Sequence, residues 1–507
     1  MSGCTGLSGS SKSELIGTQL EKHRPIDSRL ETRQSNSEER RPKLCLALSG
    51  GGVRAGATSL GVLQGLADHL SDFEYVASSS GGGYPVYGLL IDHLRTGADP
   101  KDLLSDGSDF ANNSEKNSKF ITRTNMAVGA LGALLFAVPD TAIRLMASIV
   151  PAMEEQNVYP GYGTIAYSSS IRRTFSTARN PFKDYYINDL SDDFLDQFPY
   201  PIFITSVSQG RVAPKPGMKL DGDMIFEVTP RWLGSDSTQY LTNYPFDLDL
   251  GAVIAASGAA IDTPGFKDAD YNIGVPYILK LLGFSIGVYL EYPEESNGIY
   301  LSDGGFIDNQ AVHPLIARNC QTILALDATS DEDLTFEGWQ KVSDNLETLD
   351  SGLRLSDLAA SDGTIVKVGT SNGSVWNLSD HVWNGKIESD LSDEIIDLWV
   401  LKLGYAPRTG YNEAIETFAR TNWKSRPYNK IPRCFFSKKG SKTRCAFPAE
   451  STINQSYSYE EFRAYRLLGK KMAELWLEQS SRLSDGNSHG PAGAISEPEE
   501  PARFVWK

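Results

Sequence analysis

The chain has 507 residues, of which 40% are hydrophobic and 22% charged, and its 48 Lys and Arg against 64 Asp and Glu leave a formal net charge of −16. This globular composition excludes wholesale disorder, a collagen-like repeat and a disulfide-framed miniprotein. The acidic balance argues against nucleic acid as a partner, because phosphate binding depends on Lys and Arg.

The first segment, residues 1–42, is polar and rich in Ser, Glu and Arg. We expect it to be a disordered arm. It contains no apolar stretch of the kind found in secretory signals, so a cytoplasmic location is expected. Secretion without a cleaved signal would leave the same pattern.

Two strand–turn–helix units follow the arm. A short apolar strand over 44–48 enters the glycine turn 49–52, and leucines at helical spacing follow up to Leu70. A second strand over 73–77 enters the run 78–83, and a helical pattern follows from 84 to 95. This order predicts an α/β fold with a mostly parallel central sheet.

Residues 99–197 have looser patterning and form an insertion in the expected fold. Its centre, Met126–Val138, is thirteen residues without a charge, and Pro139 follows it. That length is too short to span a bilayer. The insertion is therefore expected to be lid-like, with an interfacial helix, although a buried core helix fits the same pattern.

The remaining elements are four strands and one long helix. Strands are predicted over 201–207, 225–228, 299–302 and 322–327. A helix over 458–480 begins at the capping box formed by Ser458 and Glu461. Its apolar stripe is expected to pack on the core: Phe462, Tyr465, Leu468, Met472, Leu475 and Trp476. Residues 484–507 read as a disordered tail.

The five cysteines are too few and too scattered for a disulfide framework. Reduced thiols are the favoured expectation, and pairing of Cys434 with Cys445 in an oxidising compartment stays open. The six histidines do not cluster at zinc spacing, so no metal and no cofactor are expected.

The first glycine turn also matches the G-x-G-x-x-A pattern of dinucleotide sites. Such a site requires an acidic residue at the end of the second strand, and that strand ends at Val76, Ala77 and Ser78. No Gly-Lys-Ser/Thr follows the turn, so it is not a P-loop either.

The second turn has the pattern of a nucleophile elbow, which needs small residues two positions before and after its serine. Ser79 and Ser80 both satisfy this spacing, so spacing alone does not choose between them. No convincing Ser-His-Asp order is present. Asp303, followed by two glycines at a strand end, is instead the candidate for an activating group.

At this point the sequence resembles the patatin-like phospholipases and the cytosolic group IV phospholipases. Three motifs match in order: SGGGVR at 49–54, YVASSSGG at 75–82, and DGG at 303–305 followed by Asn309 and HPLI at 313–316. The likeness spans about 43–330 and continues more loosely to the final helix. It implies a patatin-like catalytic domain over 43–483 with a three-layer α/β/α fold.

The resemblance also implies the roles of individual residues. Ser80 is the nucleophile and Asp303 its base, Gly51 and Gly52 form the oxyanion hole, and Arg54 steadies the turn or the substrate phosphate. One departure is Ser78, where the family usually has Gly.

The implied activity is that of a lipid acyl hydrolase of phospholipase A or lysophospholipase type, a serine carboxylic-ester hydrolase. Its substrates would be phospholipids or lysophospholipids. Two alternatives stay open at this stage. A transacylase would use the same acyl-enzyme with an alcohol in place of water, and a non-catalytic lipid-binding module would use neither residue of the dyad.

Charge is unevenly distributed along the chain. Residues 327–397 include 16 acidic and four basic residues, a net charge of −12. This balance predicts a solvated acidic region. The stretch 420–445 carries a net of +9 interleaved with aromatic residues, which suits a peripheral membrane contact or a solvated loop. The candidate contacts are Lys438, Lys439, Lys442, Phe435 and Phe436. No calcium-binding C2-type module fits in the arm, so recruitment to a membrane is expected to be calcium-independent.

Overall fold

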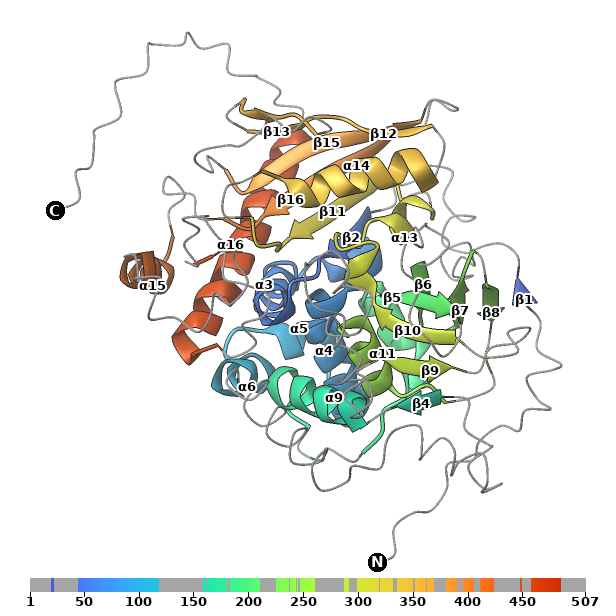
Figure 1. Cartoon of the computed structure of the whole chain (residues 1–507). Helices are drawn as coiled ribbons and strands as arrows, with labels where there is room; N and C mark the ends of the chain where they lie inside the picture. The colour runs from blue at the N-terminus through green and yellow to red at the C-terminus, as the bar shows by residue number, and fades with distance from the viewer. Residues whose placement is uncertain are drawn as a thin grey trace, which may run out of the picture.

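The computed structural model describes residues 44–117, 158–209, 225–259, 287–290, 299–368, 380–389, 395–404, 411–423, 447–448 and 457–484, apart from a few positions inside these ranges, and the short strand β1 (Leu20–Glu21). Figure 1 shows the described strands as one sheet with helices packed around it. The expected disorder of the arm 1–42 is wrong at Leu20–Glu21, because these residues pair with strand β8 (Gln239–Thr242) as the antiparallel strand β1. The predictions on the rest of the arm, on Met126–Val138, on Cys434 and Cys445, on the five membrane-contact residues and on the tail after Ser484 lie outside the described residues.

The centre of the sheet is parallel. Five strands lie side by side in the order β5 (Tyr200–Gln209), β3 (Phe73–Ser79), β2 (Leu44–Leu48), β11 (Thr322–Asp327) and β16 (Ile395–Lys402). All four neighbouring pairs run in the same direction. The predicted mostly parallel α/β sheet is therefore confirmed, and β16 is a strand that the sequence reading did not identify.

Antiparallel strands extend both sides of this centre. Beyond β5 the sheet continues through β6 (Ile225–Val228), β7 (Trp232–Ser235) and β8 (Gln239–Thr242). The strand β10 (Ile299–Asp303) also pairs with β5 and runs antiparallel to it. On the other side β16 pairs with β15 (Val382–Ser389). The shorter strands are β4 (Val158–Pro160), β9 (Val288–Leu290), β12 (Leu353–Leu355), β13 (Leu358–Ala360) and β14 (Ile365–Val366).

Helices flank the sheet, as the α/β prediction required (Figure 1). The predicted helices after the two glycine turns are α3 (Gly52–Gly65) and α4 (Tyr84–Thr96), and the predicted final helix is α16 (Tyr459–Ser484). The others are α5 (Pro100–Leu104), α6 (Asp109–Asn117), α9 (Tyr162–Phe175), α10 (Asp192–Gln197), α11 (Leu250–Ser257), α13 (His313–Ile316), α14 (Glu337–Leu349) and α15 (Glu413–Trp423). No helix among these described segments is long and apolar enough to cross a membrane.

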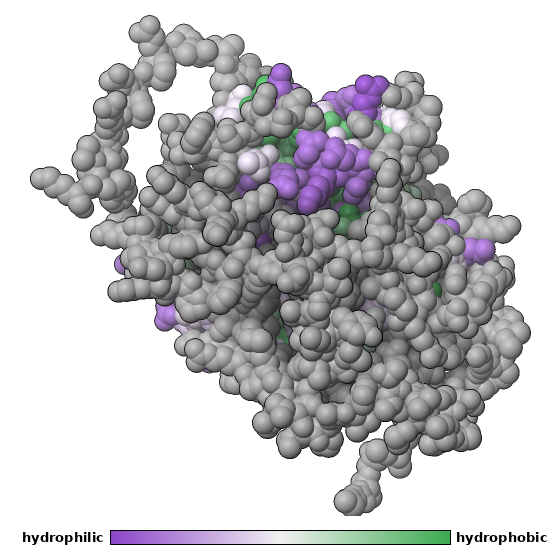
Figure 2. Space-filling view, in the orientation of Figure 1, coloured by the Kyte–Doolittle hydropathy of each residue, from purple (hydrophilic) through white to green (hydrophobic). Residues whose placement is uncertain are grey.

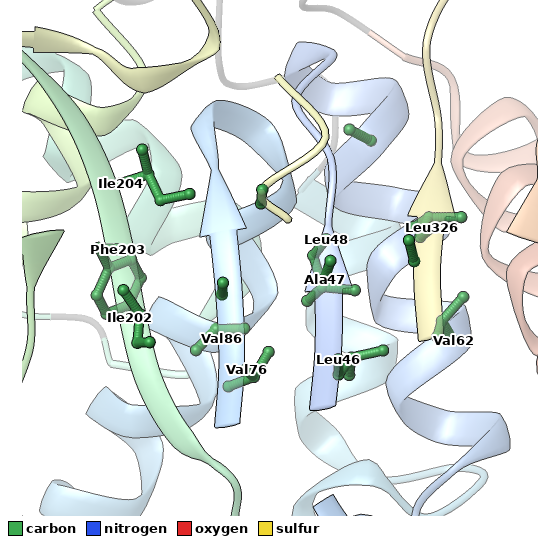
Figure 3. Packing of buried hydrophobic residues seen from close by; sticks show 14 of the residues in the cluster. Leu46, Ala47, Leu48, Val62, Val76, Val86, Ile202, Phe203, Ile204 and Leu326 are labelled. Atoms are coloured by element: carbon green, nitrogen blue, oxygen red, sulfur yellow. The ribbon is translucent and has the colours of Figure 1, made fainter. Parts of the chain in front are cut away.

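The hydrophobic core lies between the central strands and the helices. Figure 3 shows apolar side chains of β2, β3, β5 and β11 packed with Val62 of α3 and Val86 of α4. These strands are buried along nearly their whole length, which explains why each reads as a continuous apolar run. Burial of one large aliphatic side chain contributes about 1.5–3 kcal/mol. The glycine turns at the strand ends are thus anchored on a rigid base.

The acidic region 327–397 is only partly solvated. Trp339 and Leu346 of helix α14, and Phe336 directly before it, are buried, and hydrophilic side chains gather over the helix in Figure 2. The side chains of Asp327 and Asp331, in contrast, are 0% and 7% exposed. The expectation of a wholly solvated acidic region is therefore wrong at these two residues, because both pair with a buried cation described below.

The expectation of reduced cysteines is wrong for Cys45 and Cys320, which form a disulfide. Their Cα atoms are 6.1 Å apart, within the range that a disulfide spans. The reason is topological. Cys45 lies on β2 and pairs in register with Ile323 of the parallel neighbour β11, so Cys320 is brought close from 275 residues away.

The predicted capping box and apolar stripe of α16 are both confirmed. The Ser458 hydroxyl accepts from the Glu461 N–H at 3.1 Å, and the Glu461 carboxylate accepts from the Ser458 N–H at 3.2 Å. The stripe is buried against the core, with Phe462 against Phe175 and Trp476 against Phe73.

Helix α16 packs unusually close to α3, and glycines make the contact possible. A Cβ added to Gly61 would lie 1.8 Å from the carbonyl oxygen of Arg466, and one added to Gly469 would lie 2.1 Å from that of Thr58. The backbones are therefore in direct contact. Since α3 begins at the first glycine turn, α16 fixes the helix that presents this turn.

We expect Gly61→Ala to destabilise the fold by about 1–3 kcal/mol, because the new methyl forces two backbones apart in a packed interface. Urea unfolding measures the loss. Gly107→Ala is the control, because a Cβ on Gly107 would meet nothing within 4 Å. The φ of Gly107 is 82°, so the control variant still loses stability from a left-handed backbone that disfavours alanine. A loss in Gly61→Ala no larger than that in the control would contradict the close contact.

Candidate active site

Ser80 stands at a sharp turn between β3 and α4. Its φ is 49°, in the left-handed region that costs a non-glycine residue about 1–3 kcal/mol. The neighbouring glycines permit the turn, because a Cβ on Gly81 would lie 2.0 Å from the Gly52 carbonyl oxygen and one on Gly82 would lie 2.4 Å from that of Leu48. Strand, strained serine and helix follow in the order of a nucleophile elbow.

The Ser80 hydroxyl donates to a carboxylate. Its Oγ lies 3.1 Å from Oδ2 of Asp303, and both side chains are buried, with 6% and 3% exposed. Among the described residues no histidine bonds this hydroxyl. The two residues that the sequence analysis paired are therefore in hydrogen-bond contact across 223 positions of the chain.

Asp303 reaches Ser80 by an antiparallel strand. Ser79 of β3 pairs with Ile204 of β5, and Asp303 of β10 pairs with the next residue, Thr205. The sequence reading placed Asp303 at a strand end of the kind that parallel α/β sheets use. Strand β10 instead runs antiparallel to β5, and its last residue, Asp303, lies beside the end of β3 that precedes Ser80.

The three glycine motifs contact one another around this pair. Oδ1 of Asp303 accepts from the Gly305 N–H at 2.7 Å, which fixes the orientation of the carboxylate. The Gly50 N–H donates to the carbonyl of Asn309 at 2.8 Å. A Cβ on Gly50 would lie 2.3 Å from Oδ1 of Asn309 and 3.2 Å from Cβ of Ser80, so a side chain there would displace a neighbour.

Ser79 and Ser80 differ in their surroundings. The Ser79 hydroxyl is buried and has no hydrogen-bond partner among the described residues. The backbone N–H of Ser80 donates to the Ser257 hydroxyl at 3.1 Å, and that hydroxyl donates to the carbonyl of Ile204 at 2.8 Å. Ser257, at the end of α11, was not identified from the sequence, since its apolar helix gave no sign of a role.

The first glycine turn presents two N–H groups at the start of α3. Gly51 has φ 146° and Gly52 has φ 61°, conformations that favour glycine. Within the described part of the chain, no carbonyl or side chain accepts from either N–H. The start of a 14-residue helix also carries about half a positive charge. The turn can therefore bind an oxyanion.

Arg54 lies behind this turn. Its side chain is 1% exposed and Nε donates to the carbonyl of Ala328 at 2.8 Å, while the Ala328 N–H donates to the Ser49 hydroxyl at 2.8 Å. The sequence left two roles open for Arg54, and this geometry favours the steadying of the turn over contact with a substrate phosphate.

A buried ion network lies directly next to Ala328. Lys402 of β16 has a fully buried side chain, with Nζ 2.8 Å from Asp327 Oδ2 and 2.9 Å from Asp331 Oδ2. Burial opposes the charge of Lys402, but the two carboxylates outweigh it and raise its pKa. Burial alone would raise the pKa of Asp331, but Lys402 and its other hydrogen bonds lower it. No local pattern in the sequence indicates this network.

Two tyrosines lie beside the elbow. The hydroxyls of Tyr84, at the start of α4, and Tyr167, on α9, are hydrogen-bonded to each other, and the rings meet edge to face with centroids 6.4 Å apart. Burial raises the pKa of both hydroxyls well above the usual value, and the charge of Asp303 raises both further. Both tyrosines are therefore neutral and lie within the electrostatic reach of Asp303.

A small cavity with apolar walls lies between α11 and strands β5 to β7, β9 and β10. Its lining includes Ala256, which precedes Ser257, Leu301, and Thr205, the register partner of Asp303. The neighbourhood of the carboxylate is thus apolar on this side. Among the described residues no group of three or more His, Cys, Asp and Glu is placed to hold a metal ion.

The fold is similar to that of a solved phospholipase. Human GIVD cytosolic phospholipase A2 matches with a TM-score of 0.54 at 11% identity, over 94% of this chain and 66% of that one. The same human protein in complex with methyl gamma-linolenyl fluorophosphonate matches with a TM-score of 0.51 at 10% identity, over 92% of this chain and 65% of that one. The chain thus has the α/β fold of a cytosolic phospholipase A2, as the resemblance predicted.

A short segment is also similar in sequence to a lipid enzyme. Lysophospholipase NTE1 of Saccharomyces cerevisiae is 51% identical over 43 residues, which is 8% of this chain and 3% of the yeast protein. No protein-family model matches the chain. The chain therefore spans just under two thirds of the human phospholipase and a small part of the yeast one.

Proposed function

We propose that this protein is a lipid acyl hydrolase in which Ser80 is the nucleophile and Asp303 its base. The observation that carries the proposal is the 3.1 Å hydrogen bond from the Ser80 hydroxyl to Asp303, made by a strained serine that faces a glycine turn with two available N–H groups. These are the nucleophile, base and oxyanion site of acyl transfer.

The chemistry follows from the placement of these groups. Asp303 accepts the proton of Ser80 as Oγ attacks the ester carbonyl, and the N–H groups of Gly51 and Gly52 bind the oxyanion that forms. One such donor contributes about 3 kcal/mol to the transition state. The C–O bond then breaks, and the leaving alcohol takes the proton from Asp303. Water attacks the acyl-serine by the same steps, which releases the fatty acid and restores Ser80.

Fatty acyl esters of glycerophospholipids are the proposed substrates. The side chains packed beside Asp303 on the α11 side are apolar, so the surroundings of the base favour a lipid over a polar substrate. The names of the similar proteins, a phospholipase A2 and a lysophospholipase, support the same class. We further propose a peripheral contact with membranes through the basic aromatic stretch 420–445, which would place the site at its substrate.

Release of fatty acid from defined phospholipids and lysophospholipids tests the proposal. We expect the wild-type chain to hydrolyse at least one of these lipids in a detergent-dispersed assay. A chain that releases no fatty acid, but binds the same lipids, would overturn hydrolysis in favour of a binding module.

We expect charge reversal at Lys438, Lys439 and Lys442 to weaken binding to vesicles of anionic lipid by roughly 100-fold, because each basic residue near such a surface contributes about 1 kcal/mol. Vesicle sedimentation measures the affinity. The matched control is charge reversal at three lysines that are exposed on helices elsewhere in the chain: Lys101, Lys116 and Lys341. This control should change the affinity for vesicles little. Equal effects of the two triple variants would contradict a specific membrane contact.

A further inference from the structure

The bonded hydroxyls of Tyr84 and Tyr167 lie next to the group that holds the nucleophile. A Cβ on Gly258 would lie 3.0 Å from the Tyr84 hydroxyl oxygen and 3.3 Å from that of Tyr167. Gly258 follows Ser257, whose hydroxyl accepts from the Ser80 N–H. The tyrosine pair is therefore one residue removed from the contact that positions the elbow.

One proton of this pair is left over. When two hydroxyls bond to each other, one donates and the other accepts, so the acceptor retains an O–H that points elsewhere. Within the described residues each of these hydroxyls has the other as its hydrogen-bond partner. Tyr84 is fully buried and Tyr167 is partly exposed. A donor in such surroundings is costly unless it meets an acceptor.

The position of the pair indicates which acceptor it meets. Gly258, which lies against both hydroxyls, follows Ser257, and the Ser257 hydroxyl donates to the carbonyl of Ile204 at 2.8 Å. A Cβ on Gly304, the residue after Asp303, would lie 2.4 Å from that same carbonyl oxygen, so the pair and Asp303 lie on two sides of one contact. The oxygen that departs from the acyl carbon, and the water oxygen that later replaces it, must both lie beside Asp303, because this carboxyl gives its proton to the first and takes one from the second.

We propose that the Tyr84–Tyr167 pair donates a hydrogen bond from its remaining O–H to the leaving-group oxygen during acylation and to the attacking water during deacylation. This role rests on the proposed acyl hydrolase function. No proton is transferred from the tyrosine: the leaving alkoxide takes its proton from Asp303, and the O–H stabilises the charge while the C–O bond breaks. The raised pKa values keep both tyrosines protonated through these steps.

The double variant Tyr84→Phe/Tyr167→Phe tests the proposal through the dependence on the leaving group, because either single variant leaves one hydroxyl that can still donate. We compare kcat/KM, which reports acylation, for a lysophospholipid and for the 4-nitrophenyl ester of the same acyl chain. The alkoxide of the lipid leaves poorly and needs the hydrogen bond, whereas nitrophenoxide leaves without it. We expect the variant to lose roughly 10- to 100-fold on the lipid and less than about 3-fold on the nitrophenyl ester.

Tyr244→Phe is the matched control. It removes another buried tyrosine hydroxyl, which donates to the carbonyl of Thr229 at 2.9 Å, and it should leave the ratio of the two kcat/KM values unchanged. If the double variant does not fold, the two single variants replace it, and at least one of them is expected to shift the ratio in the same direction.

The outcomes separate two failures. An unchanged ratio, or an equal loss on both esters, in a folded variant of an active enzyme overturns the role of the tyrosine pair alone. A wild-type chain that cleaves neither ester overturns the proposed function, and this role with it.

Discussion

Ser80→Ala is expected to reduce kcat for fatty-acid release by about 10⁴-fold or more, since no other group in the site can form the acyl intermediate. The Ser80 Oγ is the atom that contacts Asp303 Oδ2, and the alanine variant removes it without adding bulk to a turn already in contact with Gly50. The measurement is kcat at saturating lipid, with far-UV circular dichroism to verify that the variant still folds.

Asp303→Asn should produce a loss of similar size, because an amide cannot take the serine proton, while its oxygen can still accept from the Gly305 N–H. The two residues act as one unit, so the double variant should be no worse than Ser80→Ala alone. Ser79→Ala is the control, since the Ser79 hydroxyl has no partner among the described residues. Loss of activity in Ser79→Ala, with activity retained in Ser80→Ala, would reverse our assignment.

Lys402→Met is expected to lower the free energy of unfolding by about 3–5 kcal/mol, because it leaves two carboxylates buried without their cation. Asp327 also accepts from the Trp339 indole N–H at 3.0 Å and from the Thr329 N–H at 3.0 Å, so it cannot turn toward water without breaking these bonds. Urea unfolding at pH 7 measures the loss.

Lys341→Met is the control for this variant. The ammonium of Lys341 is exposed and lies 4.0 Å from Glu337, a pair worth about 0–1 kcal/mol. A loss in Lys402→Met as small as in Lys341→Met would show that the network is not a stabilising element.

The effect of Lys402→Met should depend on pH in a direction that the pKa shifts determine. The pKa of Asp331 is lowered in the fold, so its contribution is complete above the unfolded value of about 3.9 and is lost as the pH falls through the folded value. The pKa of Lys402 is raised, so its contribution is lost only at strongly alkaline pH. The difference between wild type and variant should therefore shrink below about pH 4.

The local part of the site could be predicted from the sequence, because its signals lie within a few residues. Small residues around Ser80 indicate an elbow, and the glycines at 50–52 indicate a turn that exposes N–H groups. The choice of Ser80 over Ser79 came from resemblance alone. In the structure the two are separated by a contact with Asp303, which no local pattern contains.

What the sequence did not predict depends on long-range pairing. The antiparallel direction of β10, the disulfide of Cys45 with Cys320 and the cation at Lys402 all join segments that are remote in the chain. Lys402 is the last residue of an apolar strand that follows an acidic region, so the sequence gives it the pattern of an exposed surface lysine. Its burial becomes visible only when β16 pairs with β11.

The contact between α3 and α16 has a consequence for how the protein is made. Helix α3 is synthesised well before the backbone that packs against its Gly61, which belongs to residues 459–484. At about 5–20 residues per second, the interval between their synthesis is roughly 20–80 s. During this time the first glycine turn lacks the support of α16. The proposed hydrolase activity should therefore appear only after translation has passed α16.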